Sequence, residues 1–559
     1  FQGNEVLGMR LTWEKRYITL GPVATLLGLA FKLYDPDHLL GDKEDIGITL
    51  ALIPTATPGV NIGRRHFPLN AVFQNGPNSG QDVFIPLDYI IGGQERAGHG
   101  WRMLMNCLAA GRSISLPSSS TGMAKLAARA TGAYARVRVQ FKTPIGKFEG
   151  IEEALARIGG NTYMMDAARV MTAGAVDLGE KPSVISAVVK YHLTERGRQA
   201  INDAMDVHGG KGICMGPGNY LARAYQQIPI GITVEGANIL TRSMIIFGQG
   251  AIRGHPYVLK EIAATNEPDS DQALLDFDAA LFGHIGFTLS NAARALFHGL
   301  TGAQLAASAG APESARYYRQ LTRLSAAFAL LADVAMLVIG GALKRKEKLS
   351  ARLGDVLSQL YLCSSVLKRY EDEGRPRADL PLLHWSLQDA LYRMQLAFDG
   401  ILENFPSRPL AWLLRRAVFP LGMNFSPASD ELGHRVASLL LAPSATRDRL
   451  TAGIYVPADE ADPVGCLDIA LEAAIAAEMV EGKIRAGVKA GRIQGKTPEQ
   501  NMAQALQQGI ISAADESTLA RAQQLRRAVI MVDDFAQDFG KSEWARDAQE
   551  PEMGARKTA

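Results

Sequence analysis

A chain of 559 residues is too long to fold around one hydrophobic core, and domains of ~100–200 residues predict three to four structural units. Its 47% apolar and 21% charged residues are typical of a folded soluble protein, and a formal net charge of +2 excludes a global positive field that would recruit nucleic acid. The four cysteines are far apart in the sequence and form no metal-ligand pair, which favours a reduced compartment and predicts no metal site.

Residues 1–95 are expected to form β-strands. Short apolar or alternating runs, broken by Pro and Gly, predict strands at Arg16–Leu20, Ile46–Pro54, Phe67–Phe73 and Gln81–Pro86. The chain opens at Phe1 without an initiator Met or a signal peptide and enters this β structure directly. We therefore expect a fragment of a longer chain or a processed product.

From Gly98 the apolar period becomes helical, with further helices expected at Met123–Val137, Ile151–Leu178 and Ser183–Val207. Arg112 follows a run with no other charge from Met103, which predicts a partly buried cation with an anionic or carbonyl partner. A structural ion pair and a ligand contact explain that pattern equally well. After the third helix, the glycines of Gly209-Gly210-Lys211-Gly212 predict a tight turn whose backbone amides can approach a phosphate or an adenine.

A lone carboxylate, Glu235, follows the apolar run Pro229–Val234 and precedes apolar residues at helical spacing. We interpret the run as strand-like and expect Glu235 to lie at a helix start in dry, apolar surroundings, where Gly236 lets a ligand approach the backbone. Desolvation there raises the pKa of a carboxyl, whereas the helix N-terminus lowers it. The pattern fits a general base, and it also fits an ordinary acidic residue in the first turn of a helix.

The second half of the chain carries helical periodicity and no catalytic constellation. Its longest apolar run, Leu324–Leu343, contains Asp333 and two glycines, so we interpret it as a buried helix and not as a membrane span. Scattered histidines favour core or surface positions over metal ligands. The segment Pro406–Gly422 places Trp412 and Phe419 with two arginines on one side of a helix, which fits either a membrane interface or packing against the rest of the protein.

Five motifs in order give the sequence a family resemblance: Lys15-Arg16-Tyr17-Ile18-Thr19, Gly111-Arg112, Arg138 to Gly146, Gly209 to Gly212, and Glu235-Gly236-Ala237-Asn238. Over Phe1 to about Pro256 the chain resembles the acyl-CoA dehydrogenase flavoenzymes. The remainder is similar to the C-terminal extension of the bacterial long-chain fatty-acid-degradation (FadE) type. The resemblance implies an α+β, mostly α fold without the N-terminal helical domain: part of the middle β-domain (1–95), the C-terminal four-helix dehydrogenase domain (96–256) and an all-α extension (257–559).

The resemblance also implies the residues of a flavin site. Tyr17 and Thr19 match the strand that lies against the flavin ring, with Tyr replacing the family's Trp. The adenosine diphosphate half of a FAD bound mainly by a neighbouring subunit is expected to contact Arg138, Gln140 and Phe141, which implies a homodimer or larger assembly. Further cofactor contacts are expected from Asp206, Gly209, Gly210, Ala237 and Asn238. Two of these depart from the family, since Asp206 stands where a Gln is common and Ala237 where a Thr is usual.

The implied reaction is FAD-dependent α,β-dehydrogenation of a fatty acyl-CoA to the trans-2-enoyl-CoA, the first step of β-oxidation. Glu235 is expected to be the base, Arg112 and Gly236 to bind substrate, and an electron-transfer flavoprotein to receive the electrons. An acyl-CoA oxidase and a catalytically silent membrane or assembly scaffold are the alternatives. We expect a cytoplasmic protein, held at the inner face of the bacterial inner membrane through Pro406–Gly422.

Overall fold

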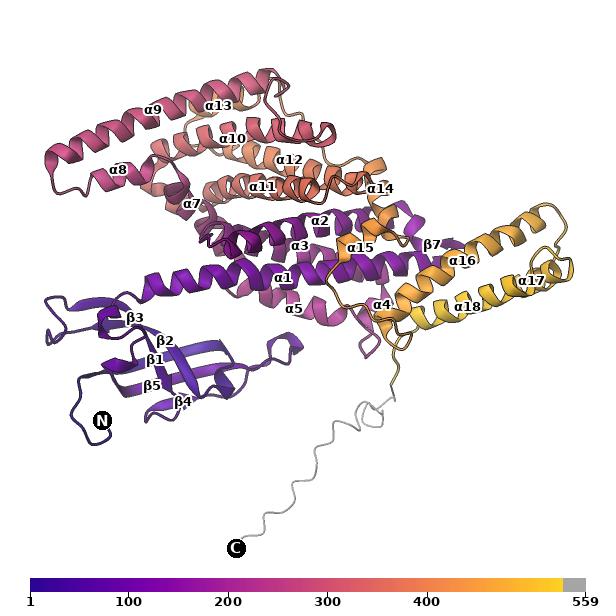
Figure 1. Cartoon of the computed structure of the whole chain (residues 1–559), viewed down its shortest axis with the longest axis horizontal. Helices are drawn as coiled ribbons and strands as arrows, with labels where there is room; N and C mark the ends of the chain where they lie inside the picture. The colour runs from indigo at the N-terminus through magenta and orange to yellow at the C-terminus, as the bar shows by residue number, and fades with distance from the viewer. Residues whose placement is uncertain (536–559) are drawn as a thin grey trace, which may run out of the picture. The chain divides into compact units, whose positions relative to one another are not determined.

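The computed structural model describes residues 1–535, and the end of the predicted extension, residues 536–559, lies outside them. The chain divides into two compact units. Unit 1 contains Phe1–Ala124, Gly159–Gln199 and Gln226–Gly433, and unit 2 contains Lys125–Ile158, Ala200–Tyr225 and His434–Ala559. Three long helices, α1 (Gly100–Val137), α2 (Glu149–Asp177) and α3 (Ile185–His208), each contribute to both units. The prediction of a mostly helical α+β fold is confirmed (Figure 1).

The strands of unit 1 form two small antiparallel sheets that share one core. One sheet has the order β1–β5–β4, from Gly8–Thr19, Asn75–Pro86 and Val60–Ile62, and the other pairs β2 (Leu26–Tyr34) with β3 (Asp45–Pro54). Alternate residues of both sheets point inward, because side chains along a strand alternate between its faces. The buried cluster includes Leu11, Leu29, Ile53, Val83 and Ile85.

Three of the four predicted strands are present, and the prediction for Phe67–Phe73 is wrong. That segment contains a single 3₁₀ turn, Pro68–Asn70, in which Leu69 and Asn70 have φ values of 45° and 63°. Pro68 lacks the N–H that a sheet ladder needs, and left-handed residues turn the chain. Strands β2 and β4 were not predicted, and Lys32 and Gly28 interrupt the apolar pattern of β2.

The helical part of unit 1 continues with α5 (Ala222–Thr233) from Gln226 onward, α6 (Asn238–Leu240), a π-helical turn (Thr241–Ile245), α7 (Ile246–Gly254) and α8 (Val258–Ala264). The long helices α9 (Ser270–Leu300), α10 (Pro312–Ile339), α11 (Glu347–Asp372) and α12 (Leu380–Glu403) then pack in sequence order, with α13 (Arg408–Val418) against α9 and α12 (Figure 1). Helix α12 also packs closely on α2. A Cβ on Gly160 would lie 1.8 Å from the Trp385 ring, so only glycine lets the two helices approach this closely.

Unit 2 is built around the C-terminal part of α1, the N-terminal part of α2 and the C-terminal end of α3. It adds the two-residue strands β6 (Val139–Gln140) and β7 (Thr143–Pro144), the short α4 (Gly210–Ile213), and helices α14 (Asp430–Leu440), α15 (Ala445–Thr451), α16 (Pro463–Lys489), α17 (Pro498–Gln507) and α18 (Ala513–Ile530). Helices α16 and α18 lie side by side (Figure 1). The predicted domain boundaries at 95 and 256 remain a prediction, since each unit is assembled from separated segments.

One apolar helix meets the length and hydropathy of a membrane span. Within residues 1–535, Pro312–Arg345 is such a helix, and 44% of its most apolar window is buried inside the protein. A second candidate is a bent pair, Ala222–Thr233 with Asn238–Ile252, broken by 49°. Asp333, inside α10, is 5% exposed and bonded to other side chains, as expected for a helix packed within the protein.

The segment Pro406–Gly422 is helical only in α13, so the prediction of one helix through Phe419 is partly wrong. Phe419 follows the end of the helix, is 3% exposed, and meets Phe398 edge-on with ring centroids 6.1 Å apart. Leu421, which also follows the end of the helix, is exposed. Trp412 remains an exposed aromatic, 60% accessible, with the Arg416 guanidinium 5.5 Å from its ring centroid.

Candidate active site

Glu235 lies in a short turn between two helices. Helix α5 ends at Thr233 and α6 begins at Asn238, so the predicted strand at Pro229–Val234 is wrong. The run forms the end of a helix in which Ile228 is buried and Tyr225 is exposed, and Pro229 is accommodated inside it. Glu235 has a left-handed φ of 53°, followed by Gly236 at 90°. For a glutamate this conformation is uncommon and must be held by its surroundings.

A buried lysine holds the turn from behind. Lys190 of α3 is 0% exposed, and its Nζ donates to the carbonyl oxygens of Gly236 at 2.7 Å and Ile232 at 3.3 Å and to Oδ1 of Asn238 at 2.7 Å. An ammonium has three donors and all three are used. Burial lowers the pKa of Lys190 to about 8, while the negative charge of Glu235 raises it. The lysine is therefore mostly protonated at neutral pH.

Asn238 completes this arrangement. It is 2% exposed, and its amide nitrogen donates to Thr194 Oγ1 at 3.0 Å and to Glu195 Oε1 at 2.8 Å. Lys190 donates to its oxygen, so each polar atom of the side chain has a partner within the protein. These bonds fix the turn, and the cofactor contact that the family resemblance implies for Asn238 stays a prediction.

Arg112 of α1 reaches the same turn. Its Nη2 donates to Ser186 Oγ at 3.3 Å, and its Nη1 lies 3.6 Å from the point where a Cβ on Gly236 would be. The Nε is buried without a hydrogen-bond partner, and burial lowers the pKa of the guanidinium while Glu235 raises it. Arg112 is partly buried, as predicted, but a single hydroxyl does not satisfy it. It keeps capacity for an anionic or carbonyl group of a ligand.

Glu235 itself is exposed, so the predicted dry pocket is not formed by residues 1–535. Partial burial of the carboxyl still raises its pKa, and the positive charges of Lys190 and Arg112 lower it. Opposing shifts of this kind are common where a carboxylate must stay ionised yet accept a proton. The exposure follows from its place at the tip of a turn, where only side chains behind the backbone surround it.

The other residues predicted for unit 1 are available on the surface. Tyr17 lies in β1 with a left-handed φ of 61° and is 75% exposed, and its ring centroid is 5.6 Å from that of His66. Thr19 ends the same strand and is exposed, as is Ala237 beside the glutamate. A flat exposed ring and a nearby hydroxyl fit the contacts expected of a strand that lies against a flavin.

A second group of predicted residues lies in unit 2. Arg138 and Gln140 lead into the β6–β7 hairpin, at whose tip Phe141 is 89% exposed with φ 50°. Asp206, near the end of α3, is exposed, and Gly209 has φ 55°. The structure brings Arg112, Gly236 and Glu235 together in unit 1 and leaves these residues in the other unit.

His208 fixes the start of the glycine turn. Its ring stacks on Tyr134 with centroids 4.2 Å apart, Nδ1 bonds the Ala204 carbonyl at 2.8 Å, and Nε2 bonds the Tyr220 hydroxyl at 2.8 Å. Burial lowers the pKa of His208 to about 4, so the ring is neutral at physiological pH. The Tyr220 hydroxyl then donates to Nε2, and the following Gly209 is held in place.

Sequence reasoning missed a cluster formed by His255, His284 and Asp333, whose ligand atoms lie within 4.8 Å of one another. His255 Nδ1 accepts two backbone N–H groups at 3.2 Å, so its Nε2 carries the proton that is donated to Asp333 Oδ1 at 2.9 Å. A nitrogen in that state has no lone pair for a metal. Since His284 bonds Glu261 at 2.8 Å, the cluster is a half-buried polar network that joins α8, α9 and α10.

Comparison with known proteins gives two family matches and several relatives. Residues 98–247 match the model for the acyl-CoA dehydrogenase C-terminal domain, and residues 252–535 match that for the acyl-CoA dehydrogenase C-terminal domain of bacterial type. The probable acyl-CoA dehydrogenase FadE10 of Mycobacterium tuberculosis is 25% identical over 73% of this chain and 61% of its own. Protein HemX of Proteus mirabilis is 65% identical over 104 residues, 19% of this chain and 61% of its own.

Among solved structures, an acyl-CoA dehydrogenase complexed with FAD from Bacillus anthracis is similar in fold. Its TM-score is 0.60 at 17% identity, over 78% of this chain and 70% of that one. The chain spans about three fifths of the length of the curated relatives it matches.

Proposed function

The chain belongs to the acyl-CoA dehydrogenase family, and from this premise we propose that it takes part in FAD-dependent α,β-dehydrogenation of a fatty acyl-CoA thioester to the trans-2-enoyl-CoA. We further propose that it is of the FadE type, with residues 257–559 as its extension. The observation that carries the proposal is the Glu235 turn, in which a strained, accessible carboxylate stands beside an unsatisfied Arg112 and is anchored by Lys190.

The residues present fit a flavin. Tyr17 and Phe141 offer exposed rings in β1 and at the hairpin tip, and Arg138 can meet a pyrophosphate with a forked guanidinium. Gly209 and Gly210 present backbone without side chains, and Asp206 stands beside them at the surface. When bound, FAD supplies the hydride acceptor. We propose that Arg138, Gln140 and Phe141 serve the cofactor of a neighbouring subunit, so that the working form is a homodimer or larger.

In this proposal Glu235 removes the proton from the carbon next to the thioester. Its raised pKa makes the carboxylate a stronger base than an ordinary glutamate, while Lys190 and Arg112 keep it ionised at neutral pH. Proton removal leaves negative charge on the thioester oxygen, which requires preorganised donors worth about 3–4 kcal/mol each. The Gly236 side of the turn, open and next to Arg112, is where the thioester is proposed to bind.

The test is bleaching of the flavin by a series of acyl-CoAs, with wild type and Glu235→Gln compared. We expect the variant to keep its yellow colour and lose bleaching. Bleaching that survives in Glu235→Gln would refute the assignment of the base. A wild-type protein that cannot be reconstituted with FAD would refute the function and favour a silent scaffold.

The electron acceptor and the location are also proposed. We propose that an electron-transfer flavoprotein takes the electrons, in which case reduction of an artificial acceptor persists without oxygen and little peroxide forms in air. Abundant peroxide would indicate an oxidase instead. We propose a cytoplasmic protein attached to the inner face of the inner membrane through α13, where Trp412 and Leu413 are 60% and 58% exposed.

A further inference from the structure

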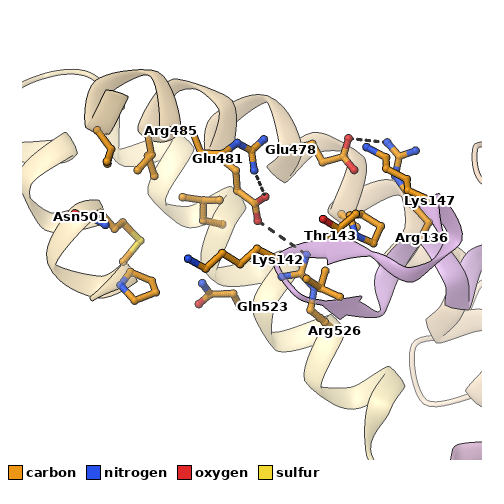
Figure 2. A pocket seen from close by; sticks show the side chains of 18 of the residues that line it. Arg136, Lys142, Thr143, Lys147, Glu478, Glu481, Arg485, Asn501, Gln523 and Arg526 are labelled. Carbon is orange, nitrogen blue, oxygen red and sulfur yellow. Dashed lines mark hydrogen bonds and ion pairs between the residues drawn. The ribbon is translucent and has the colours of Figure 1, made fainter. Parts of the chain in front are cut away.

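Unit 2 contains a cavity of about 900 Å³ whose lining residues have no role in the proposed dehydrogenation. It lies between the β6–β7 hairpin with its flanking residues and the helices α16, α17 and α18. Figure 2 shows the side chains of these elements converging on one space, with Lys142 extending into it from the hairpin. The size is in the range of sites that bind small molecules.

The charges around the cavity are unbalanced. Six cations and two carboxylates line it, and both carboxylates are engaged by arginines. Glu478 pairs with Arg136 at 2.6 Å, and Glu481 lies 3.4 Å from Arg485 and 4.0 Å from Arg526.

The lysines that line the cavity are not neutralised by the carboxylates of its wall. Lys142, Lys147 and Lys489 have no carboxylate within ion-pair distance among residues 1–535, and all three are exposed. Positive charge is therefore available here for an anion, whereas the negative charge is already neutralised within the wall.

The opposite wall is apolar. Ile484 and Val488 of α16, Met502 of α17 and Leu519 of α18 contribute alkyl and thioether surface, and Val488 remains 43% exposed. The described lining contains no aromatic side chain. Nucleobases bind mainly by stacking on aromatic rings, so this wall suits an alkyl chain better than a nucleotide.

We propose that the cavity binds an anionic amphiphile with one alkyl chain. The chain lies along Ile484, Val488 and Met502, and the phosphate or carboxylate head contacts Lys142 and Lys489. None of these residues has a role in the proposed reaction, so the inference stands apart from it.

Calorimetric titration of the full chain with soluble probes tests the chemistry. Decyl phosphate and decanoate should bind, and octyl phosphate should bind roughly tenfold more weakly because two fewer methylenes are buried. Decyltrimethylammonium, with the same chain and the opposite charge, should not bind. Equal affinity for octyl and decyl phosphate, or binding of ADP tighter than that of decyl phosphate, would overturn the proposal.

Variants locate the site. The double variant Lys142→Ala/Lys489→Ala should weaken decyl phosphate about three- to tenfold, the range expected for two exposed cations. The single variant Val488→Asn should reduce the difference between octyl and decyl phosphate. Lys496→Ala, which removes an exposed lysine outside the cavity, is the matched control and should change neither. An effect of the control as large as that of the double variant would refute the location.

Flotation with vesicles distinguishes the source of the amphiphile. Co-flotation with phosphatidylglycerol vesicles, lost in the double variant, identifies a membrane lipid. Binding of monomers without flotation identifies a free amphiphile. Both results support the proposed chemistry, whereas the absence of both refutes it.

Discussion

Removal of the buried Lys190 ammonium should release the turn that carries Glu235. The variant Lys190→Met keeps a long unbranched chain in the same space and deletes three donors. The carbonyls of Gly236 and Ile232 and the amide oxygen of Asn238 would then lose their partner inside the protein. A left-handed glutamate held in place by these bonds should relax toward an ordinary conformation.

The magnitude follows from two opposing effects. Three hydrogen bonds from a charged donor contribute about 1.5 kcal/mol each at the low end, or about 4.5 kcal/mol together. Burying the charge costs about 3 kcal/mol, since the pKa of Lys190 falls from 10.5 to about 8. The net destabilisation should be about 1–1.5 kcal/mol. The lysine therefore contributes more to the conformation of the turn than to global stability.

Hydrogen exchange and urea unfolding of the purified chain measure both effects. Amides of residues 232–241 should lose protection in Lys190→Met, and bleaching by acyl-CoA should slow more than tenfold while FAD remains bound. Lys181 is an exposed lysine in the loop before α3, and Lys181→Met is the matched control. It should leave hydrogen exchange, urea unfolding and flavin bleaching unchanged. Unaltered exchange of the turn in Lys190→Met would refute the idea that this lysine positions Glu235.

Because burial raises the pKa of Glu235, flavin bleaching should fall with decreasing pH around an inflection above the ordinary value of 4.5. Arg112→Gln should move that inflection further up, since the guanidinium lowers the pKa of the carboxyl; an unmoved inflection would show that the two do not interact. Asp333→Ala should lower the free energy of unfolding by about 2–3 kcal/mol by orphaning buried donors, whereas Asp278→Ala on exposed α9 surface should change it by less than about 0.5 kcal/mol. Trp412→Ala should reduce vesicle flotation without altering urea unfolding, because the ring is exposed.

The long helices could be predicted from sequence because their periodicity extends over many turns, and α1, α2 and α3 lie close to their expected positions. Short apolar runs were ambiguous. Pro229–Val234 has the composition of a buried strand, and only its packing shows it to be the end of α5. Phe419 was predicted to lie on one face of a helix, but α13 ends one residue earlier, at Val418. The approach of His255 to Asp333, 78 positions apart, is a tertiary contact that no local pattern encodes.

Lys190 did leave a signal in the sequence. It follows Ala187, Val188 and Val189 directly, and a lone cation in such an apolar stretch must find acceptors if it is buried. What the sequence could not supply was the identity of those acceptors, since they lie more than forty residues later in the chain.

The position of Glu235, the candidate base, is thus determined mainly by Lys190, which is buried beneath the turn. Helix α6 has only three residues, so its dipole contributes little to the charge state of Glu235, and the expected opposition between desolvation and a helix N-terminus does not describe this site. The positive charges of Lys190 and Arg112, and not a helix N-terminus, oppose the effect of desolvation on the pKa of Glu235. Lys190 fixes the turn by donating three hydrogen bonds to it. Arg112, whose Nε has no hydrogen-bond partner, faces the open side of Gly236. A ligand whose carbonyl bound Arg112 would leave that positive charge in place but displace water from Glu235, and the added desolvation would raise the pKa of the carboxyl when a proton is within reach.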